Sequence, residues 1–355
     1  MAKPPLPRAA TLQYVGRILA YRFGADRVTD LAAAMTYYLV LSVFPLLLAV
    51  VSIISLVGGA NWLVPAISGA LSSVASPEAA QTFDSIVSGF LAGEGAGLTL
   101  VISLVAAIWS ASNYIGAFTR AVNTVYQVRE GRSFVKLKAV QLLMTLVLVL
   151  AIILLGVALA VSSPAAHWLG NLVGLGDQFA AVWAWLRYPL IGVVVIILVQ
   201  LLYFVAPNVR HPRIRVLSVG AIVAIVLSVL VVEVFTIYLS VFNGASSYTK
   251  TYGALAGVII ALFLMYLINI ALILGAELDA AMERLHQLKL GLPAQSGLVL
   301  PPRDEKGIKA AQKTRAKLVE RAKAIRAAAT GSTDEKDIAW YEKYALEKER
   351  DQSLD

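Results

Sequence analysis

Long stretches without a charged side chain constrain this chain more than any other feature. Six regions lack Asp, Glu, Lys and Arg over lengths close to 20 residues or more, apart from Glu233 within the fifth. A helix needs about 20 apolar residues to cross the roughly 30 Å of hydrocarbon in a bilayer. Trimmed at Pro and turn residues, these regions predict transmembrane helices at 31–58, 97–119, 138–161, 188–206, 216–240 and 253–276.

The composition agrees with an all-α, polytopic membrane protein built as a bundle of six transmembrane helices. Hydrophobic residues make up 59% of the 355 positions and charged residues only 15%, whereas soluble domains average about 25% charged. The net charge of +8 would suggest nucleic acid as a partner of a soluble protein. Most of that charge belongs to the apolar part of the chain, so we expect membrane lipids and no nucleic acid as partners.

The basic residues predict the orientation of the helices. Short cytoplasmic loops are enriched in Lys and Arg. Here 28 of the 30 basic residues lie in the segments 1–30, 120–138, 207–215 and 277–355, which fall on one side of a six-helix topology. We therefore expect a multi-pass protein of the cell (cytoplasmic) membrane, with both the N-terminus and the C-terminus in the cytoplasm.

Three parts of the chain follow from this topology. Residues 1–30 form a cytoplasmic N-terminal segment with an interfacial helix, residues 31–285 the six-span domain, and residues 286–355 a charged cytoplasmic tail that is partly helical or disordered. Helical spacing of apolar residues over 61–92 predicts extracytoplasmic amphipathic helices. The tail is basic over 303–326, so it either binds anionic lipid headgroups or remains solvated.

Polar side chains within the spans are candidates for substrate or proton handling, because such groups usually face the protein interior or water. Glu233 is the one ionisable residue well inside a predicted span, and Thr236 extends its face. Packing between helices is the alternative explanation for each candidate, and for Glu233 the two explanations are equally weighted. The full set of candidates is Glu233, Thr236, Asn269, Asn113, Tyr38 and Ser42.

The sequence contains few of the residues and motifs that enzymes use for catalysis. It has no cysteine and only three histidines, and it lacks the motifs of zinc hydrolases, serine hydrolases and P-loop nucleotide-binding proteins. Metal-dependent hydrolysis requires several converging His or carboxylate ligands. We therefore expect no catalytic residues, no metal site and no cofactor.

Several short motifs resemble those of the YihY/BrkB family of membrane proteins. They are AMTYY at 34–38, LSVFP at 41–45, IWSAS at 108–112, AVNTVY at 121–126, YFVAPN at 203–208, YGAL at 252–255 and LGAEL at 274–278. The resemblance implies a six-span protein of the cytoplasmic membrane that supports the integrity of the cell envelope. The motif positions carried over as structural features are Thr36, Tyr37, Ser42, Pro45, Tyr252, Gly253, Gly275 and Glu277. An older family label, ribonuclease BN, finds no support in these residues.

Glu277 ends the sixth predicted span on the expected cytoplasmic side. It could pair with Arg120 or Arg129 if the second and sixth spans pack together. Such a pair would act as a structural clasp or as the gate of an inward opening, and the clasp is favoured.

Two functions remain open at this point. The first is transport of a lipid-like or amphiphilic solute through a cavity between a Pro-bent first span and the polar faces of the fifth and sixth. The second is a non-transporting scaffold that recruits envelope-assembly partners. If the protein is a scaffold, deletion of residues 303–355 should abolish its function, whereas Glu233→Gln should not.

Overall fold

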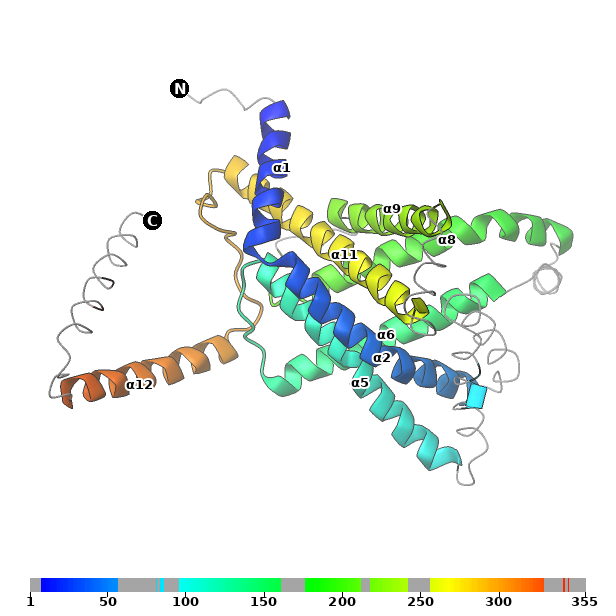
Figure 1. Cartoon of the computed structure of the whole chain (residues 1–355), viewed down its shortest axis with the longest axis horizontal. Helices are drawn as coiled ribbons and strands as arrows, with labels where there is room; N and C mark the ends of the chain where they lie inside the picture. The colour runs from blue at the N-terminus through cyan, green and yellow to red at the C-terminus, as the bar shows by residue number, and fades with distance from the viewer. Residues whose placement is uncertain are drawn as a thin grey trace. The chain divides into compact units, whose positions relative to one another are not determined.

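The computed structural model describes residues 8–56, 81, 84–85, 96–160, 176–211, 218–241, 256–328, 341 and 344. The named elements within these residues are all α-helices (Figure 1). They are α1 (Arg8–Ala25), α2 (Val28–Leu56), α5 (Ala96–Val125), α6 (Phe134–Ala160), α8 (Gly176–Val205), α9 (Val219–Val241), α11 (Ala256–Lys289) and α12 (Lys306–Ala328). The chain divides into two compact units, residues 1–305 and 306–355, and α12 belongs to the second.

A helix lies at each of the six positions where a span is expected, namely α2, α5, α6, α8, α9 and α11. In the described part of the chain, four of them are long and apolar enough to cross a membrane: α6, α8, α9 and α11. In α2 the apolar stretch found is the shorter segment Val28–Val43. The predicted amphipathic helices over 61–92 and the motif residues Tyr252 and Gly253 lie outside the described residues.

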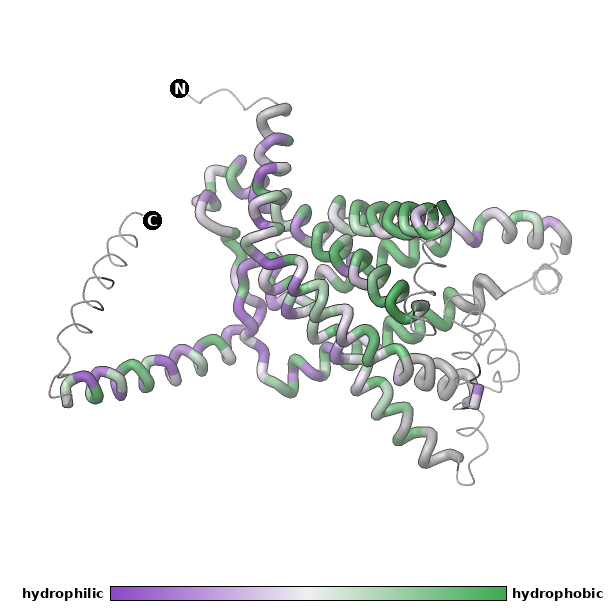
Figure 2. Tube along the Cα trace, in the orientation of Figure 1, coloured by the Kyte–Doolittle hydropathy of each residue, from purple (hydrophilic) through white to green (hydrophobic). Residues whose placement is uncertain are grey.

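The outer faces of these helices are apolar. On α9 the exposed side chains include Val226, Val229, Leu230, Val234 and Ile237. Soluble proteins rarely expose apolar patches of this extent, whereas lipid chains solvate them well. Hydrophilic residues instead gather at one end of the bundle (Figure 2), where α5, α8 and α11 end and α6 and α9 begin. We call this the polar end.

The centre of the bundle is the packing of α2 against α5 and of α11 against both α2 and α9. α6 lies against α5, α8 contacts α6 and α9, and α1 lies against α11. Large side chains that are almost fully buried, such as Met35, Ile115, Phe118 and Ile273, fill the space between them. The ring of Phe118 stacks on that of Tyr203 at a centroid distance of 6.0 Å, which joins α5 to α8.

Two glycines bring α9 and α11 into close contact. A Cβ atom on Gly275 would lie 2.5 Å from the carbonyl oxygen of Gly220 and 2.6 Å from the Cβ atom of Ala224. A Cβ atom on Gly220 would in turn lie 2.1 Å from the carbonyl oxygen of Gly275. Small residues commonly permit such close approach of helices in membranes. Gly275 is thus required at its motif position by the backbone of α9.

After α11 the chain folds back over the polar end. Residues 290–305, which we call the return segment, pair with the residues that follow α8: the Arg210 amide donates to the Pro301 carbonyl and the Arg303 amide to the Asn208 carbonyl, both at 2.9 Å. Val209 and Pro302 form an antiparallel bridge. Residues 286–305 therefore pack with the helical bundle, although the sequence suggested a boundary at 285/286.

The Gly275 contact predicts a large effect of a single methyl group. Gly275→Ala should destabilise the protein by about 1–3 kcal/mol, because α9 and α11 must move apart to accept the added Cβ atom. Gly192→Ala in α8 is the matched control, since nothing lies within 4 Å of a Cβ atom there. Thermal unfolding of both purified variants in detergent measures the difference, and equal melting temperatures would contradict the close contact.

Candidate functional site

Two of the predicted polar residues meet at the centre of the bundle. The Asn269 Nδ2 atom of α11 donates to the Thr36 hydroxyl of α2 at 3.0 Å, and the Thr36 hydroxyl donates to the Ala32 carbonyl at 2.8 Å. The hydroxyl of Tyr114 on α5 donates to the Asn269 Oδ1 atom at 3.0 Å. Three helices are thereby joined by one polar network in which Thr36 and Asn269 are buried. Tyr114 was not singled out from the sequence.

The other candidates on α2 and α5 make contacts within α2 and with neighbouring helices. The Ser42 hydroxyl donates to the Tyr38 carbonyl one turn earlier, and the Tyr38 ring lies beneath the Arg120 guanidinium at 5.4 Å. Asn113 accepts a hydrogen bond from the Lys138 ammonium at 3.2 Å. Pro45 lies within α2, and Tyr37 is exposed.

Lys138 is a buried cation that the sequence analysis passed over. Its ammonium donates to the Ser112 hydroxyl at 2.6 Å and lies 4.4 Å from the centroid of the Trp109 ring. Both partners belong to the IWSAS motif of α5. The motif therefore serves to hold the start of α6 against α5.

Glu233 and Thr236 lie elsewhere. Both are exposed on α9. Ala224 packs against α11, and Glu233 lies on the opposite face of α9. The Thr236 hydroxyl donates to the Val232 carbonyl of its own helix at 2.8 Å. The structure therefore does not bring these two residues together with Asn269, Asn113, Tyr38 or Ser42, and the candidates do not line one common cavity.

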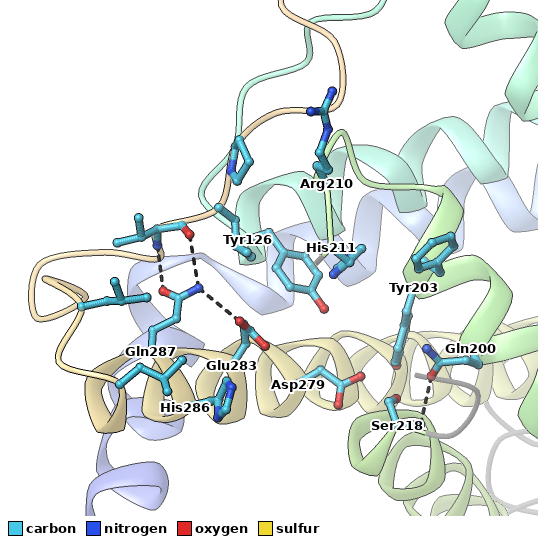
Figure 3. Close-up of a pocket in the computed structure, with 16 residues that line it drawn as sticks. Tyr126, Gln200, Tyr203, Arg210, His211, Ser218, Asp279, Glu283, His286 and Gln287 are labelled. Atoms are coloured by element: carbon cyan, nitrogen blue, oxygen red, sulfur yellow. Dashed lines mark hydrogen bonds between the residues drawn. The ribbon is translucent and has the colours of Figure 1, made fainter. Parts of the chain in front are cut away.

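A cavity of about 640 Å³ opens at the polar end of the bundle (Figure 3). Its walls come from the ends of α5, α8 and α11, the start of α9, and the return segment. The wall carries groups of both charge signs beside aromatic rings. The charged groups are Arg210, Asp279 and Glu283, the imidazoles come from His211 and His286, and the other rings from Tyr126, Tyr203 and Phe204.

Hydrogen bonds fix several of these side chains. The carboxylate of Asp279 accepts from the Gly220 amide at 2.8 Å in the first turn of α9, where a negative charge is favoured by the helix dipole. The Ser218 hydroxyl caps the same helix by accepting from the Ala221 amide at 3.0 Å. The Tyr203 hydroxyl donates to the Leu272 carbonyl. The wall formed by α8, α9 and α11 is therefore held in place by the helix ends themselves.

The opposite wall depends on Gln287. Its Oε1 atom accepts from the Val299 amide at 2.9 Å, and its Nε2 atom donates to Glu283 at 3.2 Å. The rings of Phe204 and Tyr126 flank His211, each with a centroid distance of 5.4 Å. In the described part of the chain, no group of three or more His, Cys, Asp or Glu residues is arranged to hold a metal ion.

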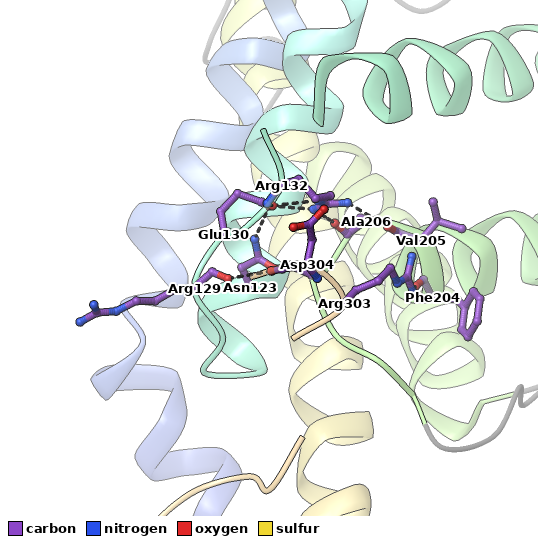
Figure 4. A network of polar contacts seen from close by, with 10 residues as sticks. Asn123, Arg129, Glu130, Arg132, Phe204, Val205, Ala206, Arg303 and Asp304 are labelled. Atoms are coloured by element: carbon purple, nitrogen blue, oxygen red, sulfur yellow. Dashed lines mark hydrogen bonds and ion pairs between the residues drawn. The ribbon is translucent and has the colours of Figure 1, made fainter. Parts of the chain in front are cut away.

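A polar network next to the cavity locks the return segment to the bundle (Figure 4). The side chain of Asn208 donates to the Asp304 carbonyl at 2.8 Å and accepts from the Asp304 amide at 3.0 Å. The Asn208 amide donates to the Asn123 side chain at 2.8 Å. A Cβ atom on Gly131 would lie 1.8 Å from the Asp304 carbonyl oxygen, so the return segment passes directly over this glycine. The AVNTVY and YFVAPN motifs thus meet in one contact.

Arg132 joins this network to the end of α8 (Figure 4). Its guanidinium pairs with the Glu130 carboxylate at 2.7 Å and donates to the Ala206 carbonyl at the end of α8, also at 2.7 Å. Partial burial opposes ionisation of Glu130, but the hydrogen bonds and charge of Arg132, with a hydrogen bond from Asn123, hold its pKa below the ordinary value. Burial lowers the pKa of Arg303, and the nearby charge of Arg132 adds to this effect.

A second hollow of about 580 Å³ lies on the apolar face between α9 and α11. Its lining is almost wholly hydrocarbon and consists of Leu227, Leu230, Val231, Val234, Phe235, Tyr238, Phe263 and Leu267. α11 therefore contributes to a charged cavity near its end and to an apolar groove nearer its start.

The charged neighbours of Glu277 differ from those expected. Glu277 is buried, and the groups beside its carboxyl are Arg22 of α1 and Asp26, which directly follows α1. Arg120 instead lies over Tyr38, and the carbonyl of Arg129 binds Asn208. The predicted pairing with Arg120 or Arg129 is thus replaced by a contact with α1, since α1 packs directly on α11.

An apolar helical bundle with a charged cavity at one end defines a helical integral membrane protein. The chain belongs to the BrkB family, because the family model described as "Virulence factor BrkB" matches residues 19–296. The relationship indicated by the motifs is confirmed. No solved structure matches the chain.

Curated relatives agree with this family. The chain is 29% identical over 257 residues to the "Putative ribonuclease-like protein YfkH" of Bacillus subtilis (strain 168), covering 72% of this chain and 90% of that protein. It is 28% identical over 279 residues to a "UPF0761 membrane protein" of Xanthomonas oryzae pv. oryzae, covering 78% of this chain. That match spans 62% of the length of the Xanthomonas protein.

The central network predicts coupling between helices. Tyr114→Phe removes the hydroxyl that donates to the Asn269 Oδ1 atom. We expect the loss of this hydrogen bond to lower stability by about 0.5–2 kcal/mol. Its effect should largely vanish in an Asn269→Leu background, because the shared bond is already lost. Unfolding in detergent of the four proteins of this cycle measures the coupling. Tyr266→Phe is the control, and additive effects would contradict the network.

The ion pair of Glu130 predicts a loss of stability in acid. A carboxylate whose folded pKa is lowered stabilises the protein above its unfolded pKa of about 4.3, and this contribution is lost as the pH falls through the folded pKa. Glu130→Gln should therefore be less stable than the parent at neutral pH, with a deficit that shrinks below about pH 4. Melting temperatures over a pH series test this.

The exposed Glu320 of α12 gives the control for that series. Glu320→Gln should follow the parent at every pH, because exposed ion pairs contribute little. A deficit of Glu130→Gln that stays constant on acidification would rule out the ion pair as its cause.

Proposed function

We propose that this protein binds and moves an amphiphilic, lipid-like solute of the cell envelope, without catalysing a reaction on it. The headgroup occupies the cavity at the polar end, and a hydrocarbon chain lies along the apolar groove between α9 and α11. Asp279 of the cavity and Leu267 of the groove are 12 residues apart on α11, or about 18 Å at 1.5 Å per residue.

The observation that carries this proposal is the mixed charge of the cavity wall. Arg210 supplies a cation and Glu283 an anion around one space of about 640 Å³, within the volume range of small-molecule sites. A headgroup with both an amine and a phosphate would satisfy both signs. Aromatic side chains such as Tyr126 provide a flat apolar wall beside them.

The proposal includes the location of the protein in the cytoplasmic membrane, with the polar end and both termini in the cytoplasm. The excess of basic residues on that side supports this orientation. We also propose that α12, which carries eight Lys or Arg residues and one Glu, binds anionic lipid headgroups.

Transport can be tested with the full chain in proteoliposomes. The probe is phosphatidylethanolamine with a fluorophore on its acyl chain, which dithionite quenches only in the outer leaflet. Faster quenching of the inner pool than in empty liposomes is the expected result. Glu283→Gln and Arg210→Gln should slow it at least about tenfold, because hydrogen bonds to charged groups contribute about 1.5–3 kcal/mol.

Two controls make the result specific. Arg17→Gln changes an exposed basic residue of α1 outside the cavity and should leave the rate unchanged. Leu267→Trp fills the groove and should slow the movement while leaving the cavity intact. Rates equal to those of empty liposomes for the parent and every variant would contradict transport and favour the scaffold.

A further inference from the structure

A carboxyl group with one unsatisfied oxygen atom is buried where α1 meets α11. Glu277 is 2% exposed, and its Oε1 atom has no partner among the described residues. A buried carboxylate that lacks a partner carries a desolvation cost of several kcal/mol, so such a group normally binds something or becomes neutral. The central network, the cavity and the return segment make no use of it.

The Glu277 side chain borders a small cavity of about 10 Å³. This is close to the smallest volume that holds one water molecule. α1 contributes Ile18, Leu19 and Arg22 to its lining, α11 contributes Ala280, Ala281 and Arg284, and Val125, Gln127 and Leu298 complete it. The space is too small for a solute and is separate from the cavity proposed to bind a headgroup.

The charged groups that face Glu277 are few. Asp26 directly follows α1, and its carboxyl lies within hydrogen-bonding reach of Glu277. Arg22 of α1 pairs with Asp26 at 3.2 Å. From α11 itself the cavity is lined by Arg284, but this guanidinium donates to the carbonyls of Ala294 and Gln295. The remaining lining residues from α5, the loop after it and the return segment carry no charge.

Two carboxyl groups therefore share the single cation Arg22. When two carboxylates meet in a poorly solvated site, one of them retains a proton that the other accepts as a hydrogen bond. We propose that Asp26 and Glu277 form a proton-binding site that fastens α1 to α11. Binding converts one carboxylate to a carboxylic acid, which donates its O–H to the other carboxylate. Release of the proton leaves two adjacent negative charges and separates α1 from α11.

The site is independent of the proposed transport function, because it needs only α1, α11 and a proton. It joins the N-terminal helix to the helix that lines both hollows. The occupancy of this site therefore sets whether the polar end of the bundle is held by α1.

Infrared titration of the full chain in lipid measures the proton directly. The parent should show a carboxylic-acid carbonyl band that shifts in D₂O, persists above about pH 5, where exposed carboxyl groups have lost their protons, and disappears as the pH is raised further. Glu277→Gln and Asp26→Asn should each remove this band, whereas Asp30→Asn, an exposed carboxylate of α2, should keep it. A parent spectrum without a titrating, D₂O-sensitive band would overturn the site without any variant.

The absence of cysteine in the chain allows the movement to be measured as well. Spin labels on Leu12→Cys of α1 and Lys289→Cys of α11, both exposed positions, report the distance between the helices by pulsed electron resonance. The distance should lengthen as the pH rises in the parent and in Asp30→Asn. It should be independent of pH in Glu277→Gln, and an unchanged distance in the parent would overturn the fastening of α1. Neither measurement depends on lipid movement.

Discussion

Hydrocarbon offers no hydrogen bonds, so polar groups buried among membrane helices must find their partners in other parts of the same protein. This requirement explains the contact of Thr36, Asn269 and Tyr114, in which three helices satisfy one another at the centre of the bundle. It also explains why Lys138 lies against a hydroxyl and an indole ring of α5. The polar side chains at these positions fix which helices are neighbours, while the apolar side chains fill the space.

The two hollows of the protein lie along one pair of helices. The glycine contact at Gly220 and Gly275 holds α9 and α11 together at the level between them, so the cavity and the groove keep a fixed relation. A substrate with a charged head and an apolar chain matches that division, and a small ion or a soluble metabolite would match only one part of it.

The sequence predicted the helices well because a charge-free run of sufficient length has few other stable structures in a membrane. It identified Thr36 and Asn269 but not Tyr114, since helical spacing shows which residues share a face and not which helix lies opposite. For the same reason Glu277 was assigned partners on α5 or in the loop after it, whereas its neighbours are Arg22 of α1 and Asp26 at the end of that helix. The return segment has no periodic pattern, so its pairing with Asn208 and the cavity that it completes had no signal in the sequence.

The return segment has a consequence for how the protein is made. Lys136 binds Asp304, and Gln127 binds Leu298, across separations of 168 and 171 residues. The loop between α5 and α6 leaves the ribosome long before either partner has been synthesised. The contacts of this loop with Leu298 and Asp304 therefore form only after α11 has been synthesised.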